Sequence, residues 1–135
     1  MTPKNMKTTA VDKADYAIYL NKANDFYEMT QKASDSENWT GIGLNAVHCA
    51  ISSCDALLAF HLGIRSTSDN HMDAVDLLMR IPKVRLSEEA GAFKRIIAKK
   101  NLIAYECREF RRSEALEILK MTERFYRWAL SSLPR

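Results

Sequence analysis

The segment from Trp39 to Leu62 limits the possible folds of this chain more than any other part of it. Between Leu44 and Leu62 it contains no lysine or arginine, and Asp55 is its only carboxylate. Its main apolar stripe has the spacing of an α-helix, and alanine, leucine and phenylalanine also occur on the opposite face. A helix that is apolar nearly all round is buried on most of its sides. The segment therefore predicts a helix at the centre of a bundle or at a contact with a second subunit.

Five helical segments are predicted, and no stretch has the pattern of a strand. They cover about residues 12–32, 39–62, 70–80 and 87–110, and the last begins at about residue 113. Glycine and proline are scarce, at 4 and 3 of 135 residues, which favours helices. We therefore predict an all-α fold, an up-and-down four-helix bundle with one additional short helix. Residues 1–11 are expected to form a flexible N-terminus, and residues 12–135 a single domain.

The start of the chain and its cysteines indicate a cytoplasmic protein. The first residues lack the apolar core of a signal peptide. No run of about 18 uninterrupted apolar residues occurs, so we expect no membrane span. Cys49, Cys54 and Cys107 form no CxxC motif, which favours free thiols in a reducing compartment. The histidines and cysteines also lack the spacing of a metal site, so no metal and no cofactor are expected.

One lysine in the predicted helix over residues 87–110 stands out. Lys100 falls near the centre of the apolar face of that helix. That face consists of Phe93, Ile96, Ile97, Ile103, Ala104 and Cys107. A buried ammonium group is costly unless it is paired or neutralised, so one hypothesis is a contact between Lys100 and Asp55. The alternative is that the lysine stem lies along apolar surface while the ammonium group reaches water.

The charge is distributed unevenly along the chain. The formal net charge is +3. Residues 1–82 carry 7 basic and 10 acidic side chains, whereas residues 83–135 carry 13 basic and 7 acidic ones. A basic C-terminal half could attract phosphate groups, or it could be a solvated helix surface that complements the acidic half. Both interpretations remain open from the sequence.

The middle of the chain resembles a known family of helical bundles. The stretch "NAVHCAISSCDALLAFHLGIRSTSDNHMDAVDLL", followed by "KKNLIAYE", is similar to the HEPN superfamily of prokaryotic proteins. The matching features are an alanine-rich second helix, a Leu-Leu pair, a Gly-Ile-Arg turn and a histidine that opens a short helix. In this chain they are Leu57, Leu58, Gly63, Ile64, Arg65 and His71. The resemblance covers residues 39–126.

The resemblance implies where a functional site would lie. In the family, an arginine followed by a polar residue and, four to six residues later, a histidine cleaves RNA without metal across a dimer. The matching positions here are Lys100, Asn101 and Tyr105. Lysine can hold a phosphate but lacks the two-pronged guanidinium of arginine, and a phenol is a poor proton shuttle at neutral pH. The motif is therefore degenerate, and the resemblance implies the noncatalytic branch of the family.

We therefore expect a noncatalytic, HEPN-like interaction or ligand-binding module in a toxin–antitoxin, defence or RNA-associated system. Lys100 would contact a phosphate or another anion, with Asn101 and Tyr105 as hydrogen-bond donors and Asp55 orienting the lysine. A homodimer is expected because the helix over residues 39–62 is apolar nearly all round and Leu102 leaves a second apolar spot on the fourth helix. The resemblance further implies a nucleotidyltransferase-type protein partner and RNA or a nucleotide as ligand. Two alternatives remain: a metal-independent ribonuclease at a dimer cleft, and a purely structural dimer.

Overall fold

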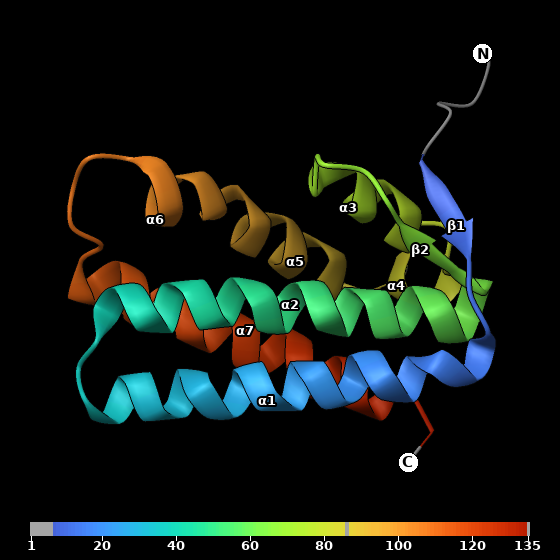
Figure 1. The fold of residues 1–135 in the computed structure, drawn as a ribbon, viewed down its shortest axis with the longest axis horizontal. Helices are drawn as coiled ribbons and strands as arrows, with labels where there is room; N and C mark the ends of the chain where they lie inside the picture. The colour runs from blue at the N-terminus through green and yellow to red at the C-terminus, as the bar shows by residue number, and fades with distance from the viewer. Residues whose placement is uncertain (1–6, 86, 135) are drawn as a thin grey trace.

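The computed structural model describes residues 7–85 and 87–134. Its long helices run alternately up and down along a common direction (Figure 1). They are α1 (Tyr16–Asp35), α2 (Trp39–Leu62), α5 (Glu89–Ala98) continued by α6 (Lys100–Tyr105), and α7 (Arg112–Ser131). The prediction of an all-α helical bundle is thus confirmed.

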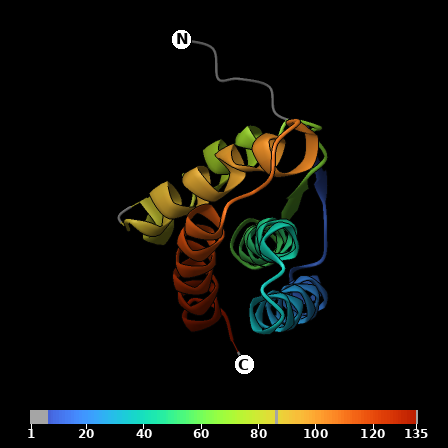
Figure 2. The same ribbon diagram turned by 90° about the vertical axis from the view of Figure 1, so that its left-hand side faces the viewer.

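Helix α2 lies at the centre of the molecule. Seen end-on, it is flanked by α1, by α7 and by the layer that α5 and α6 form (Figure 2). Leu57, Leu58 and Ile42 on different faces of α2 have no exposed surface. By length and composition this helix could cross a membrane, yet 72% of its apolar window is buried inside the protein. Its apolar character is therefore accounted for by the core of one chain, which is the first of the two predicted alternatives.

Two caps fix the ends of α2 where the sequence predicts them. The Asn38 side chain accepts a hydrogen bond from the Gly41 amide at 2.9 Å, which satisfies a free donor of the first turn. At the other end Gly63 adopts a left-handed conformation, with φ of 64°, and donates to the Ala59 carbonyl. The positive φ at Gly63 turns the chain directly from α2 into a short strand.

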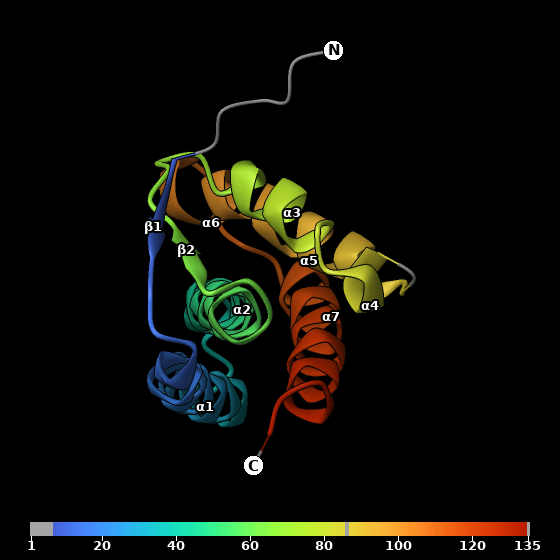
Figure 3. The ribbon, with the colours of Figure 1, turned by 90° about the vertical axis from the view of Figure 1, so that its right-hand side faces the viewer.

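That strand is part of a small sheet that was not predicted. Strand β2 (Ile64–Ser66) pairs antiparallel with β1 (Thr8–Ala10), with Thr9 opposite Arg65 (Figure 3). A one-turn 3-10 helix, η1 (Lys13–Asp15), then leads into α1. Within residues 1–11, which were predicted to form a flexible N-terminus, Thr8–Ala10 thus form a strand. Residues 1–6 lie outside the described residues.

The predicted helix over residues 87–110 is broken. The α5 segment ends at Ala98, α6 ends at Tyr105, and the backbone is extended at Glu106. Contacts at Gly43 explain the break: an added Cβ there would lie 2.9 Å from both Ile103 Cδ1 and Phe110 Cε2. Seven residues of continuous helix would separate those two side chains by about 10 Å along the axis. The chain must therefore leave the helix to bring Phe110 back to α2.

The break changes the surroundings of the residues that follow it. Phe93, Ile96 and Ile97 are buried as predicted, whereas Ala104 and Cys107 are exposed. The predicted apolar face thus ends at Ile103, which packs against the core from α6, and Lys100 lies half-buried at the start of that helix. Between α2 and α5 the chain forms α3 (Met72–Leu78) and α4 (Pro82–Arg85), the first of which is the predicted short helix.

Candidate functional site

Two pockets lie beside α2, and a third lies between the start of α3 and the junction of α5 with α6. The central pocket has a volume of about 280 Å³ and a mostly polar lining of Asp55, Arg65, Ser66, Thr67, Ser68 and His71. The α1 pocket, of about 400 Å³, lies between α1 and α2 and includes Lys22, Asp25 and Phe26. The Lys100 pocket, of about 200 Å³, includes Asn70, Lys100 and Asn101.

Shared lining residues place the three pockets next to one another. Asp55 and Arg65 line both the central pocket and the α1 pocket. His71 lines both the central pocket and the Lys100 pocket. The central pocket therefore lies between the other two and shares at least one lining residue with each of them.

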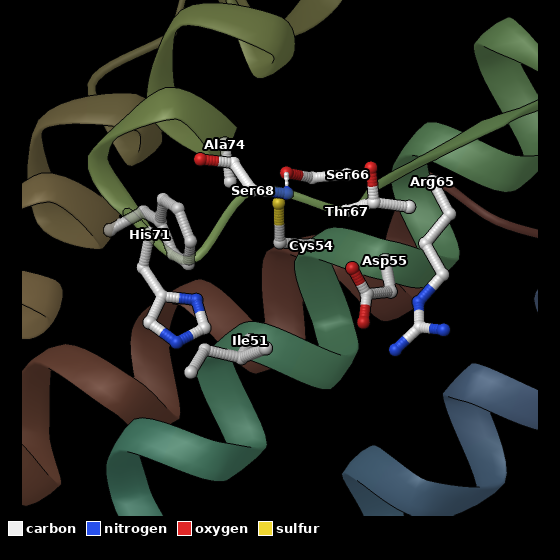
Figure 4. A pocket seen from close by; sticks show the side chains of 10 residues that line it. Ile51, Cys54, Asp55, Arg65, Ser66, Thr67, Ser68, His71 and Ala74 are labelled. Carbon is white, nitrogen blue, oxygen red and sulfur yellow. Dashed lines mark hydrogen bonds between the residues drawn. The ribbon is translucent and has the colours of Figure 1, made fainter. Parts of the chain in front are cut away.

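The polar residues of the central pocket come from three parts of the chain. Asp55 projects from α2, Arg65 from β2, and His71 from the start of α3 (Figure 4). In this view Asp55 and Arg65 lie side by side, and His71 lies across the pocket from them. The connecting loop is held by Ser68, whose hydroxyl donates to Asp73 at 2.7 Å and accepts from the Asn70 amide. The site therefore depends on the loop that follows the sheet.

The Asp55 carboxylate is held in an unfavourable environment. Burial raises the pKa of Asp55 to about 6, while the positive charges of Arg65 and Lys22 oppose that rise. The carboxylate forms no hydrogen bond and no ion pair with any residue that the structure describes. A carboxylate that is desolvated and unpartnered, and that borders two pockets, is a typical feature of a binding site.

Two histidines accompany Lys100. The pKa of His48 and that of His71 are both lowered, mainly by burial and further by the positive charge of Lys100. The His48 ring also stacks on Phe26, with 5.2 Å between ring centroids. Two imidazoles, from α2 and from the start of α3, therefore lie within electrostatic range of the Lys100 charge on α6, and burial and that charge both favour their neutral forms.

The predicted pair of Asp55 and Lys100 does not form. Within residues 7–85 and 87–134 no ion pair joins them, and they line different pockets. The cations that act on Asp55 are Arg65 and Lys22. Lys100 is half-buried at the edge of its pocket, which agrees with the alternative that its stem packs while the ammonium group stays accessible.

Of the other two predicted site residues, one lines the Lys100 pocket and one does not. Asn101 lines the Lys100 pocket beside the lysine, as expected. Tyr105 is 76% exposed and lines none of the three pockets described here. Sequence reasoning placed His71 at the start of a short helix, but it joined neither His71 nor His48 to Lys100. The signal for His71 was its place in the resemblance to the HEPN superfamily.

The structure also bears on whether the buried thiols are reactive and whether a metal ion could be held. Cys54 borders the central pocket, and burial raises its pKa well above the ordinary value; burial also raises the pKa of Cys49 to about 12. Both thiols therefore stay protonated and are poor nucleophiles. In the part of the chain that the structure describes, no three histidine, cysteine or acidic side chains are grouped to hold a metal ion.

Comparison with known proteins gave no match: no family model, no curated protein and no solved structure is significantly similar to this chain. The resemblance to the HEPN superfamily therefore stays a prediction from the sequence. What the site can do is argued below from its own residues.

Proposed function

We propose that this chain is an HEPN-like helical module that binds an anionic ligand, RNA or a nucleotide, and that it acts in a toxin–antitoxin, defence or RNA-associated system. The observation that carries the binding proposal is the position of Lys100. Lys100 lines a pocket with Asn101, and its positive charge lowers the pKa of both His48 and His71. A phosphate in this pocket meets the permanent positive charge of Lys100 and the His71 imidazole, which can gain one, while His48 lies within electrostatic range of Lys100.

The electrostatics of this cluster favour a negatively charged ligand. A bound phosphate would offset the Lys100 charge that keeps both imidazoles neutral, so the pKa of each would rise. Each imidazole that takes up a proton then donates a charge-assisted hydrogen bond to the phosphate. The Asn101 side chain adds a neutral donor in the same pocket.

A homodimer and a nucleotidyltransferase-type partner remain part of the proposal. The core of one chain already accounts for α2, and Leu102 packs partly buried against the same core. What supports association instead is the apolar surface that stays exposed on α2, α6 and α7. The residues are Leu44, Tyr105 and Leu116, at 38%, 76% and 41% exposure. Mass measurement in solution checks the dimer, and copurification with the proposed partner checks the second contact.

A filter-binding assay with labelled single-stranded RNA tests the binding proposal. We expect retention that falls as salt rises, because phosphate contacts release counterions. Lys100→Ala should weaken binding by about five- to tenfold and reduce the salt slope by about one. Lys94→Ala is the matched control, since Lys94 is exposed on α5 and lines none of the three pockets. No retained RNA, or equal losses in both variants, would exclude the Lys100 site and favour a purely structural dimer.

The same cluster favours a metal-independent ribonuclease as the second candidate. Two imidazoles beside an ammonium group can divide the chemistry of phosphodiester cleavage. One imidazole accepts the proton of the 2′-hydroxyl as its oxygen attacks phosphorus. The other, in its protonated form, gives a proton to the 5′-oxygen that leaves, while Lys100 stabilises the phosphate charge.

Cleavage of labelled RNA in the presence of a chelator distinguishes the two candidates. An enzyme should lose at least about a hundredfold in rate in both His48→Gln and His71→Gln, because each removes one proton-transfer group. His61→Gln is the control: His61 lies at the other end of α2, where its ring contacts the Ser132 carbonyl. Absence of cleavage across the pH range would leave the binding module as the function.

A further inference from the structure

The Asp55 carboxylate has capacity for hydrogen bonds that the protein does not use. It borders the central pocket and the α1 pocket and forms no hydrogen bond with any described residue. A carboxylate can accept bonds at two oxygens side by side. The unused acceptors point to a ligand that brings two donors to this place.

The charges around Asp55 argue against a cationic ligand. Arg65 and Lys22 already act on the carboxylate from β2 and α1. Arg65 lies with its guanidinium carbon 5.7 Å from the Tyr19 ring, and the Lys22 ammonium lies 5.9 Å from it, so the same aromatic ring faces two cations. A further cation would be repelled by both groups. Neutral donors on a ligand that carries its negative charge elsewhere fit the site better.

We propose that the central pocket recognises a guanine base, whose N1–H and N2–H₂ donors bind the two oxygens of Asp55. Guanine is the ribonucleobase that offers two adjacent donors on its Watson–Crick edge; adenine and cytosine offer one amino group and uracil one ring N–H. Recognition of that edge is how proteins read unpaired bases. At about 280 Å³ the pocket is smaller than sites for drug-sized ligands, which begin at about 300 Å³. It therefore suits a base and not a whole nucleotide.

The position of His71 joins this inference to the proposed function, on which the phosphate part rests. His71 borders both the central pocket and the Lys100 pocket. A guanine nucleotide, or a guanosine within single-stranded RNA, then places its base against Asp55 and its phosphate against Lys100. The hydroxyls of Ser66 and Thr67 border the central pocket and are available to the sugar. The ligand class is thus a guanine-containing nucleotide or RNA.

Equilibrium dialysis with nucleosides tests the base pocket without any phosphate. At pH 8 we expect guanosine to bind at least about tenfold more tightly than inosine, which lacks only the 2-amino group, because one charge-assisted hydrogen bond is lost. Adenosine should bind no better than inosine. Equal binding of the three nucleosides, or binding of none, would overturn the inference, and this comparison requires no variant that might fail to fold.

Two variants test whether the preference for guanosine over inosine depends on Asp55. Asp55→Asn should remove the preference for guanosine over inosine, because an amide presents one acceptor and one donor. Asp25→Asn should keep it, since Asp25 lines the α1 pocket and is not part of the central pocket. An unchanged preference in Asp55→Asn would overturn the inference.

Comparison of guanosine with its 5′-monophosphate separates this inference from the proposed function. We expect the monophosphate to bind about tenfold more tightly, with the gain lost in Lys100→Ala. Selective guanosine binding without a gain from the phosphate would exclude the Lys100 site and leave the base pocket in place. Monophosphates of guanosine and adenosine that bind equally, both weakened by Lys100→Ala, would retain the Lys100 site and overturn the guanine inference.

Discussion

Arg65 lies beside Asp55 in two pockets, yet the two side chains form no ion pair (Figure 4). The guanidinium lowers the pKa of Asp55, but burial outweighs it and the pKa settles at about 6. Arg65 instead lies over the Tyr19 ring from its position on β2. The carboxylate therefore remains available to a ligand, and the protein bears the free-energy cost of its burial.

Replacing Asp55 should make the protein more stable at alkaline pH. The folded-state pKa of about 6 exceeds the model-compound value of 3.8, so folding favours the protonated carboxyl. The contribution of this carboxyl to the free energy of unfolding is fully present below pH 3.8 and is lost as the pH rises through 6. The neutral amide of Asp55→Asn does not ionise, so this variant keeps its stability as the pH rises. Its free energy of unfolding at pH 8 should exceed that of the parent by about 1–3 kcal/mol.

Urea denaturation of the two proteins at pH 4 and pH 8 measures this difference. The gain should be small at pH 4 and reach its full value above about pH 7. Other titrating groups occur in both proteins, so their contributions cancel in the comparison. A variant that is less stable than the parent at pH 8 would mean that the Asp55 charge is well compensated, contrary to the geometry described.

Removing the charge of Lys100 should raise the pKa of two histidines at once. Lys100 lowers the pKa of both His48 and His71, so Lys100→Ala should move both titration midpoints upward. Burial is the larger cause in each case, and the midpoints should therefore stay below the ordinary value of 6.5. Titration of the imidazole carbon resonances by NMR gives both values in one experiment.

His61 provides an internal control for that titration. Its pKa is lowered by burial, Lys83 and Lys13, and Lys100 is not among the causes. Its midpoint should not move in Lys100→Ala. If the titration midpoints of His48 and His71 do not move either, these two side chains and Lys100 do not form the cluster on which the proposed function depends.

Two glycine-to-alanine substitutions should change stability in opposite directions. A Cβ at Gly43 would lie 2.9 Å from Ile103 and Phe110, so Gly43→Ala must displace α6 or the segment after it. We expect a loss of about 1–3 kcal/mol, as for other overpacked sites. Gly91 lies inside α5, where a Cβ meets only the end of Arg95 at 3.6 Å. Gly91→Ala should therefore gain about 0.5–1 kcal/mol through helix propensity.

Urea midpoints of the two variants, compared with the parent, test this contrast. Because α6 begins with Lys100, Gly43→Ala should also weaken RNA binding in the filter assay, whereas Gly91→Ala should not. A Gly43→Ala protein as stable as Gly91→Ala would show that α6 moves without cost and that its packing on α2 does not hold Lys100 in place.

The elements with strong local signals could be predicted from the sequence. Helix α2 begins after Asn38 and ends at Gly63 because both residues cap it through their own conformations. The end of α6 has no such signal, since the apolar pattern continues past Tyr105 and contacts with Gly43 on another helix decide where the chain turns. The same is true of β1, whose three residues become a strand only because β2 lies beside them.

The sequence indicated which residues belong to the candidate site, but it did not indicate which of them lie together. Asp55 and Lys100 stand out as charged residues among apolar neighbours, and both line pockets. Which cation meets which anion depends on where β2 and α6 lie around α2, and spacing along the chain carries no information on that. Arg65 and His71 thus replace the partners that periodicity suggested.

Guanosine binding should be lost as the pH falls through about 6. Above this value the Asp55 carboxyl is ionised and accepts two hydrogen bonds; below it the protonated form keeps fewer acceptor sites and presents a donor to a donor. The charged or titrating groups around it are Lys22 and Asp25 on α1, Arg65 on β2 and His71 at the start of α3. Of these, His71 is a second titratable group, and its pKa is lowered from 6.5 mainly by burial.

Dialysis of guanosine between pH 5 and pH 8 measures the profile, and a His71→Gln variant separates the two titrating groups. We expect the affinity to fall by about tenfold for each pH unit below the midpoint, in the parent and in His71→Gln alike, as for the loss of one ionised acceptor. Because bound donors favour the ionised carboxylate, the midpoint of the complex should lie below that of the free protein. A profile that is flat in the parent, or that disappears in His71→Gln, would assign the base contact to a group other than Asp55.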